Sequence, residues 1–284
     1  MRDTDSKSQQ RIRLRKGLGQ HILLDPNINR KMVEIADVGD RDLVVEVGAG
    51  HGGLTRLLAE RAGAVFALEI DARFEPILNG KFGTSSNVTI FIGDVLNHDL
   101  TDLLAAHLPH DGLLKMVSNL PYYITSPILE QFLESDLFFE TMVVMVQKEV
   151  AGRLTAEPGS REYGVLSLAA RFYAEVDAIR DVPKTCFRPV PDVDSTIVRF
   201  RCRRKTAVEG EEKAFLFHVI RAGFGERRKM LKNALARSAE LAISREEVDQ
   251  ALETADVRGE RRAETLDLDE FLRLARALRD VTTS

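Results

Sequence analysis

Short aliphatic runs that alternate with amphipathic stretches are the feature of this 284-residue chain that most restricts its fold. Between Arg41 and Arg204, five such runs are each bounded by Gly, Asp or Asn, which is typical of strands buried on both faces of a parallel sheet. The predicted strands are Leu43–Val47, Ala64–Leu68, Val88–Ile92, Leu114–Val117 and Met142–Val146. Two later runs, Ala174–Val182 and Thr196–Arg203, predict an antiparallel pair at the sheet edge, so the fold is α/β.

The sequence changes character after Lys205, where Glu, Lys, Arg, Leu and Ala dominate and no strand-like run occurs. Apolar residues recur there at intervals of three and four, which predicts helices; they are Phe215, Val219, Ala222, Leu231, Leu235, Leu268, Phe271, Leu274 and Leu278. We therefore predict three segments, which are a basic N-terminal segment at 1–40, a sheet domain at 41–205 and a small all-α C-terminal domain at 206–284.

Charge is distributed unevenly although the net charge is only −4. Residues 1–31 hold eight Lys or Arg against three Asp, and residues 199–232 hold eleven against four Glu. A solvated charged face is the alternative, but the second segment lies where the two predicted domains join, and a polyanion could be gripped there. The candidate RNA-binding cations of this segment are Arg221, Arg227, Arg228, Lys229 and Lys232.

Other features argue against export, membranes and metals. No apolar run approaches the roughly 18 residues that would span a bilayer, and residues 1–10 form no apolar signal core, so we expect a cytoplasmic protein. Cys186 and Cys202 lack the spacing of a zinc site or of a disulfide framework, and no set of His, Cys and carboxylates has ligand spacing.

A glycine-rich turn after the first predicted strand indicates a nucleoside-binding βαβ unit. Gly48, Gly50 and Gly53 follow Glu46 and precede a helical pattern, and Glu69 lies at the end of the next strand. This spacing alone does not separate NAD from S-adenosylmethionine. The acidic Glu46 before the first glycine favours a methyltransferase, and Glu69 could accept both ribose hydroxyls. Asp94, after the third strand, could accept from an adenine amine.

The run Asn119-Leu120-Pro121-Tyr122 follows the fourth predicted strand and has the Asn-Pro-Pro-Tyr type of pattern seen in enzymes that methylate exocyclic amines of bases. The lone pair of the adenine amine is delocalised into its ring. The Asn119 side-chain oxygen and the Leu120 carbonyl could each accept one N–H and draw the amine towards a tetrahedral shape. Pro121 fixes the turn, and Tyr122 offers a face on which the base can stack. A packed β-turn is the alternative for this tetrapeptide alone.

The proline-rich loop holds a second aromatic candidate. Phe187 lies in Cys186-Phe187-Arg188-Pro189-Val190-Pro191, a stiff segment that could place its ring over the other face of the base. Interdomain core is an equally good prediction for this side chain.

Taken together, these motifs resemble the bacterial small-subunit ribosomal RNA adenine dimethyltransferases over nearly the whole chain. Beyond the turns already described, the matching segments are Gly19-Gln20-His21-Ile22-Leu23, Glu69-Ile70-Asp71, Gln147-Lys148-Glu149-Val150, Tyr163-Gly164, Val193-Asp194-Ser195 and Phe224 to Asn233. The resemblance implies a class I, Rossmann-like methyltransferase that uses S-adenosyl-L-methionine. It also implies that four methyl groups go to two adjacent adenines in the 3′-terminal hairpin loop of 16S RNA, within an immature 30S particle.

The resemblance further implies which residues line the cofactor site: His21, Leu23, Gly48, Glu69, Asp94 and Asn119. Two positions depart from the family pattern. His21 stands where Asn is usual, which affects its expected hydrogen bond to the amino acid end of the cofactor. Asp192 replaces a frequent Lys and removes one possible phosphate contact.

Three other functions remain open from the sequence. A 23S adenine methyltransferase of the macrolide-resistance type is similar through the catalytic domain, but residues 224–233 look like the small-subunit family. An RNA-binding assembly factor without catalysis would not need the intact turn at 119–122. An NAD-dependent oxidoreductase would need hydride-transfer residues, which we do not find. We expect a monomer.

Overall fold

The computed structural model of the chain describes residues 21–226 and 228–283. Its main sheet has seven strands in the order β4-β3-β2-β5-β6-β9-β7, and the first five are parallel. They are β2 (Leu43–Val47), β3 (Ala64–Glu69), β4 (Val88–Ile92), β5 (Leu114–Asn119) and β6 (Thr141–Gln147). Strands β9 (Ser195–Cys202) and β7 (Ala174–Val182) form the predicted antiparallel pair; β7 is the edge strand, and β9 is also antiparallel to β6. The predicted fold class is confirmed.

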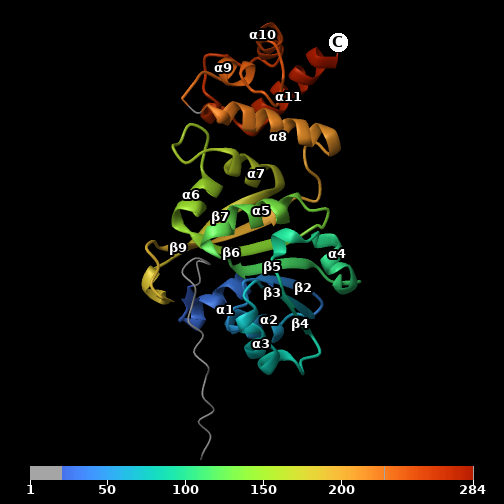
Figure 1. The fold of residues 1–284 in the computed structure, drawn as a ribbon, viewed down its shortest axis with the longest axis vertical. Helices are drawn as coiled ribbons and strands as arrows, with labels where there is room; N and C mark the ends of the chain where they lie inside the picture. The colour runs from blue at the N-terminus through green and yellow to red at the C-terminus, as the bar shows by residue number, and fades with distance from the viewer. Residues whose placement is uncertain (1–20, 227, 284) are drawn as a thin grey trace, which may run out of the picture.

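Helices cover both faces of the sheet (Figure 1). Helices α1 (Pro26–Ile35), α2 (Gly53–Ala59) and α3 (Glu75–Phe82) pack on one face. Helices α4 (Leu100–Leu104), α5 (Thr125–Glu134), α6 (Lys148–Thr155) and α7 (Val165–Tyr173) lie on the other. Successive strand residues point to opposite faces, so Val45 and Val47 join one core cluster and Val44 joins the other. Both clusters are apolar, which is why the strands read as continuous aliphatic runs.

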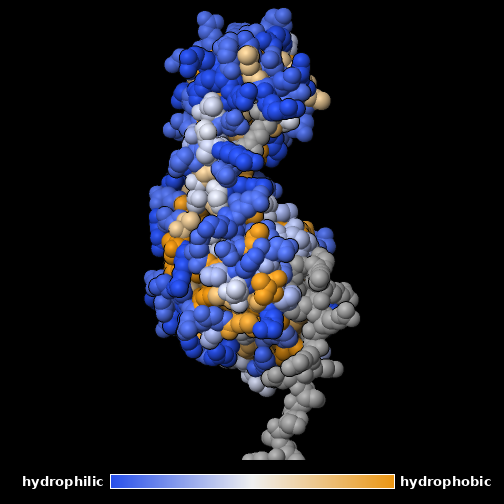
Figure 2. Space-filling model, turned by 90° about the vertical axis from the view of Figure 1, so that its left-hand side faces the viewer, coloured by the Kyte–Doolittle hydropathy of each residue, from blue (hydrophilic) through white to orange (hydrophobic). Residues whose placement is uncertain are grey.

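The C-terminal part is helical, as predicted, and comprises α8 (Gly210–Gly225), α9 (Leu231–Ala236), α10 (Arg245–Thr254) and α11 (Leu268–Thr283). It forms a separate lobe beyond α7 (Figure 1). The lobe is packed on the sheet domain, because the Phe217 ring on α8 lies 5.3 Å from that of Phe172 and 5.9 Å from that of Tyr173. On the face shown in Figure 2, this lobe is mostly hydrophilic, whereas hydrophobic residues gather on the sheet-containing part.

A two-stranded sheet joins the N-terminal part of the described chain to the proline-rich loop. Strand β1 (Ile22–Leu23) pairs antiparallel with β8 (Phe187–Arg188), and the Leu24 amide donates to the Cys186 carbonyl at 2.8 Å. The pairing brings His21 beside the loop that follows β8. Half of the predicted basic N-terminal segment, residues 1–20, lies outside the described residues.

Candidate functional site: a pocket at the carboxyl ends of the parallel strands

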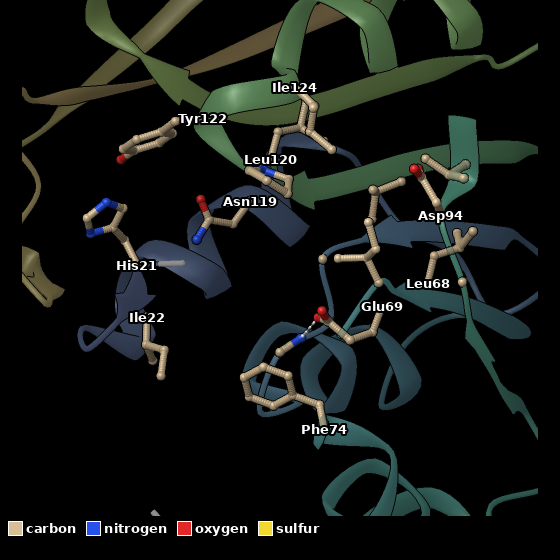
Figure 3. Close-up of a pocket in the computed structure, with 17 residues that line it drawn as sticks. His21, Ile22, Leu68, Glu69, Phe74, Asp94, Asn119, Leu120, Tyr122 and Ile124 are labelled. Atoms are coloured by element: carbon tan, nitrogen blue, oxygen red, sulfur yellow. Dashed lines mark hydrogen bonds between the residues drawn. The ribbon is translucent and has the colours of Figure 1, made fainter. Parts of the chain in front are cut away.

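One pocket lies where the strand order reverses between β2 and β5, the usual ligand site of an open α/β sheet. Residues from the ends of β2, β3, β4 and β5 meet there, together with the N-terminal segment (Figure 3). The lining residues include eight of the predicted site positions, which are His21, Gly48, Glu69, Asp94, Asn119, Leu120, Pro121 and Tyr122. Far-apart sequence motifs therefore converge on one cavity.

The glycine turn after β2 forms one wall of the pocket. Gly48 has φ +86°, in the left-handed region that favours glycine, and its amide donates to the Leu68 carbonyl at 2.8 Å. A Cβ at Gly48 would lie 3.4 Å from the Asn119 carbonyl oxygen and 3.6 Å from Cδ of Pro121. The turn thus packs directly against the Asn119–Tyr122 segment, and a Cβ at this glycine would be in van der Waals contact with that segment.

Glu69 anchors the same turn from the end of β3. Its Oε2 accepts from the Gly50 amide at 2.7 Å, and its Oε1 accepts from the Asp71 amide at 3.0 Å. Only 5% of Glu69 is exposed, and this burial raises the pKa of its carboxyl. Each carboxylate oxygen has a second lone pair, so Glu69 can still accept from the hydroxyls of a ribose.

Asp94 caps the short 3₁₀ helix that follows β4. Its Oδ1 accepts from the Leu96 amide at 3.0 Å, while Oδ2 has a long contact of 3.5 Å with the side-chain nitrogen of Asn97. Oδ2 is therefore the better placed of the two oxygens to accept from an amine. Asp94 and Glu69 lie at the same end of the pocket (Figure 3).

Glu46 lies beneath the turn, outside the pocket lining. It is 1% exposed, and its Oε2 accepts from the Thr55 hydroxyl on α2 at 2.6 Å. Burial, reinforced by the nearby charge of Glu69, raises the pKa of Glu46 to about 8, against the hydrogen bond from Thr55 that lowers it. Glu46 therefore joins β2 to α2 beneath the glycine turn.

The run Asn119-Leu120-Pro121-Tyr122 crosses the middle of the pocket, from the end of β5 into a 3₁₀ turn at Tyr122–Ile124. The Leu120 amide donates to the Met145 carbonyl at 3.2 Å, and the Thr125 hydroxyl donates to the Pro121 carbonyl at 3.0 Å. Among the described residues, neither the Asn119 side chain nor the Leu120 carbonyl has a hydrogen-bond partner. Both acceptors are thus available to a ligand.

Two other side chains hold Tyr122. Its hydroxyl lies 2.5 Å from Oγ of Ser195, and its ring stacks on the ring of His21 at a centroid distance of 5.4 Å. Burial raises the pKa of Tyr122, so the phenol stays neutral at physiological pH. Ser195 belongs to the segment Val193-Asp194-Ser195 that resembles the family, but its position in the sequence indicates no function; it reaches Tyr122 only because β9 returns beside β6.

Two predicted site residues lie elsewhere. Leu23 packs with the core cluster under α1, and its neighbour Ile22 lines the pocket instead, because adjacent strand residues point to opposite sides. Phe187 is 1% exposed and pairs with Leu23 across β1 and β8. In this conformation the Phe187 ring has no open face on which a base could stack. Phe187 is therefore a core residue here and not a stacking residue.

The predicted RNA-binding cations differ in their surroundings. Arg221, Arg228 and Lys229 are exposed on or just after α8, whereas Arg227 lies outside the described residues. Lys232 differs, because its Nζ lies 2.7 Å from the Glu260 carboxylate and only a quarter of its side chain is exposed. Its charge is already neutralised within the lobe.

Asp192 is the second position at which the sequence departs from the family pattern. Its backbone carbonyl accepts from Nζ of Lys184 at 3.1 Å, so a lysine does reach this loop.

The structure adds two observations on the kinds of site that residues 21–226 and 228–283 contain. Within these ranges no three His, Cys, Asp or Glu side chains are grouped so that they could hold a metal ion. No helix of the described chain has the length and apolar composition needed to cross a membrane.

Comparison with known proteins agrees with the geometry. Residues 11–280 match the family described as ribosomal RNA adenine dimethylase. A relative from Bacillus pumilus, named ribosomal RNA small subunit methyltransferase A, is 43% identical over 93% of this chain and 91% of its own. The relative of the same name from Bacillus mycoides is 42% identical over the same shares of the two chains.

Solved structures show the same fold. A dimethyladenosine transferase from Plasmodium falciparum has a TM-score of 0.74 at 23% identity and covers 92% of this chain and 98% of its own. The 23S rRNA methyltransferase ErmE has a TM-score of 0.67 at 28% identity and covers 91% of this chain and 99% of its own. The likeness extends over sheet and helical lobe alike.

Proposed function

Because the chain belongs to the ribosomal RNA adenine dimethylase family, which methylates N6 of adenine from S-adenosylmethionine, we propose that its substrate is a pair of adjacent adenines in the 3′-terminal hairpin loop of 16S RNA. The observation that supports this most directly is the position of the Asn119–Tyr122 turn. It lies in the same cavity as Gly48, Glu69 and Asp94, so a methyl donor and an adenine can meet there.

The pocket fits the cofactor by the chemistry of its donors and acceptors. Glu69 is placed to accept from ribose hydroxyls and Asp94 from the adenine amine, while Gly48 lets the backbone approach a ligand closely. When bound, the cofactor supplies an activated methyl group on a sulfonium. We assign its binding to Gly48, Glu69, Asp94 and Asn119, together with the backbone of residues 21 and 22.

The residues of the turn act on the target amine. The Asn119 Oδ1 and the Leu120 carbonyl accept its two N–H groups, which turns the nitrogen lone pair out of the ring plane and towards the methyl group. Tyr122 holds the extruded base by stacking. In-line placement of the two reactants accounts for much of the rate, and the proton that leaves the amine after transfer needs no strong base within the pocket.

The small subunit is the favoured source of the RNA. The relatives at 42–43% identity are named for it, whereas ErmE, named for 23S rRNA, is 28% identical. A binding factor without catalysis is the weaker alternative, because Asn119 and Leu120 both line the pocket and no hydrogen bond within the described residues occupies their two acceptors. We place the reaction in the cytoplasm, on an immature 30S particle. We also propose that the protein acts as a monomer.

Methyl incorporation tests this function. Labelled S-adenosylmethionine is supplied to unmethylated 30S and 50S particles in parallel, and labelled 16S RNA is digested to locate N6,N6-dimethyladenosine. We expect label in two adjacent adenines of the 3′-terminal hairpin and none in 50S. Label in 50S alone would assign the chain to the 23S type, and cofactor binding without any incorporation would make it a binding factor.

A further inference from the structure

The ring of His21 lies against that of Tyr122 at the end of the pocket opposite Glu69 and Asp94, and Asn119 lies between the two ends (Figure 3). The two rings have an interplanar angle of 28°. His21 is thus far from the carboxylates assigned to the adenosine part of the cofactor and close to the residue assigned to the target base.

A hydrogen bond fixes the imidazole in this position. Nδ1 of His21 lies 2.7 Å from the Pro189 carbonyl oxygen. A carbonyl oxygen only accepts, so Nδ1 carries the proton. The next residues, Ile22 and Leu23, pair with Arg188 and Phe187, which ties the backbone on both sides of this contact. An Asn at position 21 would have no ring to lay on Tyr122.

The hydroxyl end of Tyr122 is fixed separately. Ser195, whose side chain is fully buried, shares a 2.5 Å hydrogen bond with the Tyr122 hydroxyl. Ser195 is paired in β9 with Gln147 of β6 and Val182 of β7, so its position is set by the sheet. One end of the Tyr122 ring is therefore bonded and one of its faces is covered.

From these contacts we propose that His21 and Ser195 are positioning residues that clamp Tyr122, leaving one face of its ring for the target adenine. His21 then serves the nucleobase rather than the amino acid end of the cofactor. This inference rests on the proposed function, because it assumes that Tyr122 receives the base. It differs from that function in assigning a role to two residues that do not themselves touch the reacting atoms.

A double-mutant cycle tests the Ser195 half. Ser195→Ala and Tyr122→Phe each remove one partner of the same hydrogen bond. We expect each to lower kcat for RNA methylation about 10-fold, and the double variant to be no worse than either single one. Ser195→Thr, which keeps a hydroxyl, should recover activity. Additive losses in the double variant would show that the two hydroxyls act independently and would overturn the proposal.

Three substitutions test the His21 half. His21→Phe keeps a ring but removes the bond to Pro189, His21→Asn restores the usual family residue, and His21→Ala removes both. We expect His21→Phe to have the highest kcat of the three, His21→Asn a lower one and His21→Ala the lowest. The Kd of S-adenosylmethionine, measured by calorimetry, should change less than about threefold. A cofactor Kd that rises tenfold or more with kcat unchanged would return His21 to the cofactor and refute this assignment.

A fluorescent base gives a readout that a general folding defect does not move. RNA with 2-aminopurine at the target position should be quenched on binding by stacking, and quenching should decrease in His21→Ala and Ser195→Ala at saturating protein. Unchanged quenching in both variants would contradict the clamp. All variants are compared with the unmodified protein, whose own methyl incorporation decides the proposed function separately. Thermal unfolding confirms that each variant is folded.

Discussion

The backbone of Gly48 lies so close to Asn119 that a Cβ at Gly48 would stand 3.4 Å from the Asn119 carbonyl oxygen. This approach joins the turn assigned to the cofactor with the turn assigned to the base. Gly48→Ala should therefore weaken S-adenosylmethionine binding and lower kcat together, because an L-residue at φ +86° costs roughly 1–2 kcal/mol and its relaxation would shift the backbone that contacts the acceptor turn. Calorimetry and single-turnover methylation measure both effects.

Gly159→Ala is a matched control for this substitution. Gly159 has φ +87° and no atom within 4 Å of an added Cβ, so it imposes the same backbone penalty away from the pocket. It should lower the melting temperature without changing the cofactor Kd. If Gly48→Ala and Gly159→Ala behaved alike, the close approach would have no functional meaning.

Removal of the Asn119 acceptor should separate binding from chemistry. In Asn119→Ala we expect most of the cofactor affinity to remain and kcat to fall by ~10² or more, as for the loss of one preorganised hydrogen-bonding group in a transition state. Asn79→Ala, at an exposed position on α3, serves as the control. Turnover retained in Asn119→Ala would remove the assignment of its oxygen to the amine.

Glu46 should make stability depend on pH. Its pKa is raised to about 8 in the folded state, from an ordinary value of 4.5, so the folded protein binds the extra proton between these values. The contribution of this proton to the free energy of unfolding is fully present below about pH 4.5 and is lost as pH rises through about 8. In Glu46→Gln, which keeps an acceptor for Thr55, the free energy of unfolding should depend less on pH across this window. Relative to the wild type, the variant should gain stability above pH 8 by on the order of a few kcal/mol.

Urea unfolding of the wild type and Glu46→Gln at pH 5.5, 7 and 8.5 measures this difference. The comparison between the two proteins at each pH cancels the contributions of other titrating groups. A constant difference across the three values would mean that Glu46 is ionised in the folded state and that its burial does not control its proton.

Phe187 distinguishes a core residue from a stacking residue. Phe187→Ala should destabilise the fold by ~3–5 kcal/mol, because it removes a ring that is 1% exposed. Phe187→Leu should cost far less and retain methylation, since packing rather than a flat face is what the position requires. Thermal unfolding and kcat decide the matter together: a stable but inactive Phe187→Leu protein would restore the stacking role.

The fold could be predicted from sequence because the strands carry their own signals. Leu43–Val47 and Val88–Ile92 were predicted to the residue, and the other central strands are longer by one to two residues at one or both ends. The extra residues are all polar, and two of them, Glu69 and Asn119, line the pocket, so the hydrophobic pattern ends before the strand does. The parallel arrangement then brings Gly48, Glu69 and Asp94 to one edge.

Contacts set by the edge strands could not be predicted in this way. Ser195 reaches Tyr122 across 73 positions of sequence, and His21 reaches Pro189 across 168. Neither pairing has a local signature, because each depends on the register of a strand against a distant partner. The same limitation explains Phe187, whose burial follows from the pairing of β1 with β8.

Salt dependence tests the basic segment after α8. Each cation that neutralises an RNA phosphate contributes roughly 0.7–0.9 to the slope of log K against log salt concentration. Arg228→Ala with Lys229→Ala should therefore reduce the slope by about 1.5, because both side chains are exposed. Lys232→Ala should change it much less, since this lysine already pairs with Glu260 at 2.7 Å. Filter binding to 30S particles between about 50 and 300 mM salt gives the slopes. If Lys232→Ala reduced the slope as much per lysine as the double variant does per cation, the ion pair with Glu260 would open when RNA binds. An unchanged slope in the double variant would place the RNA elsewhere.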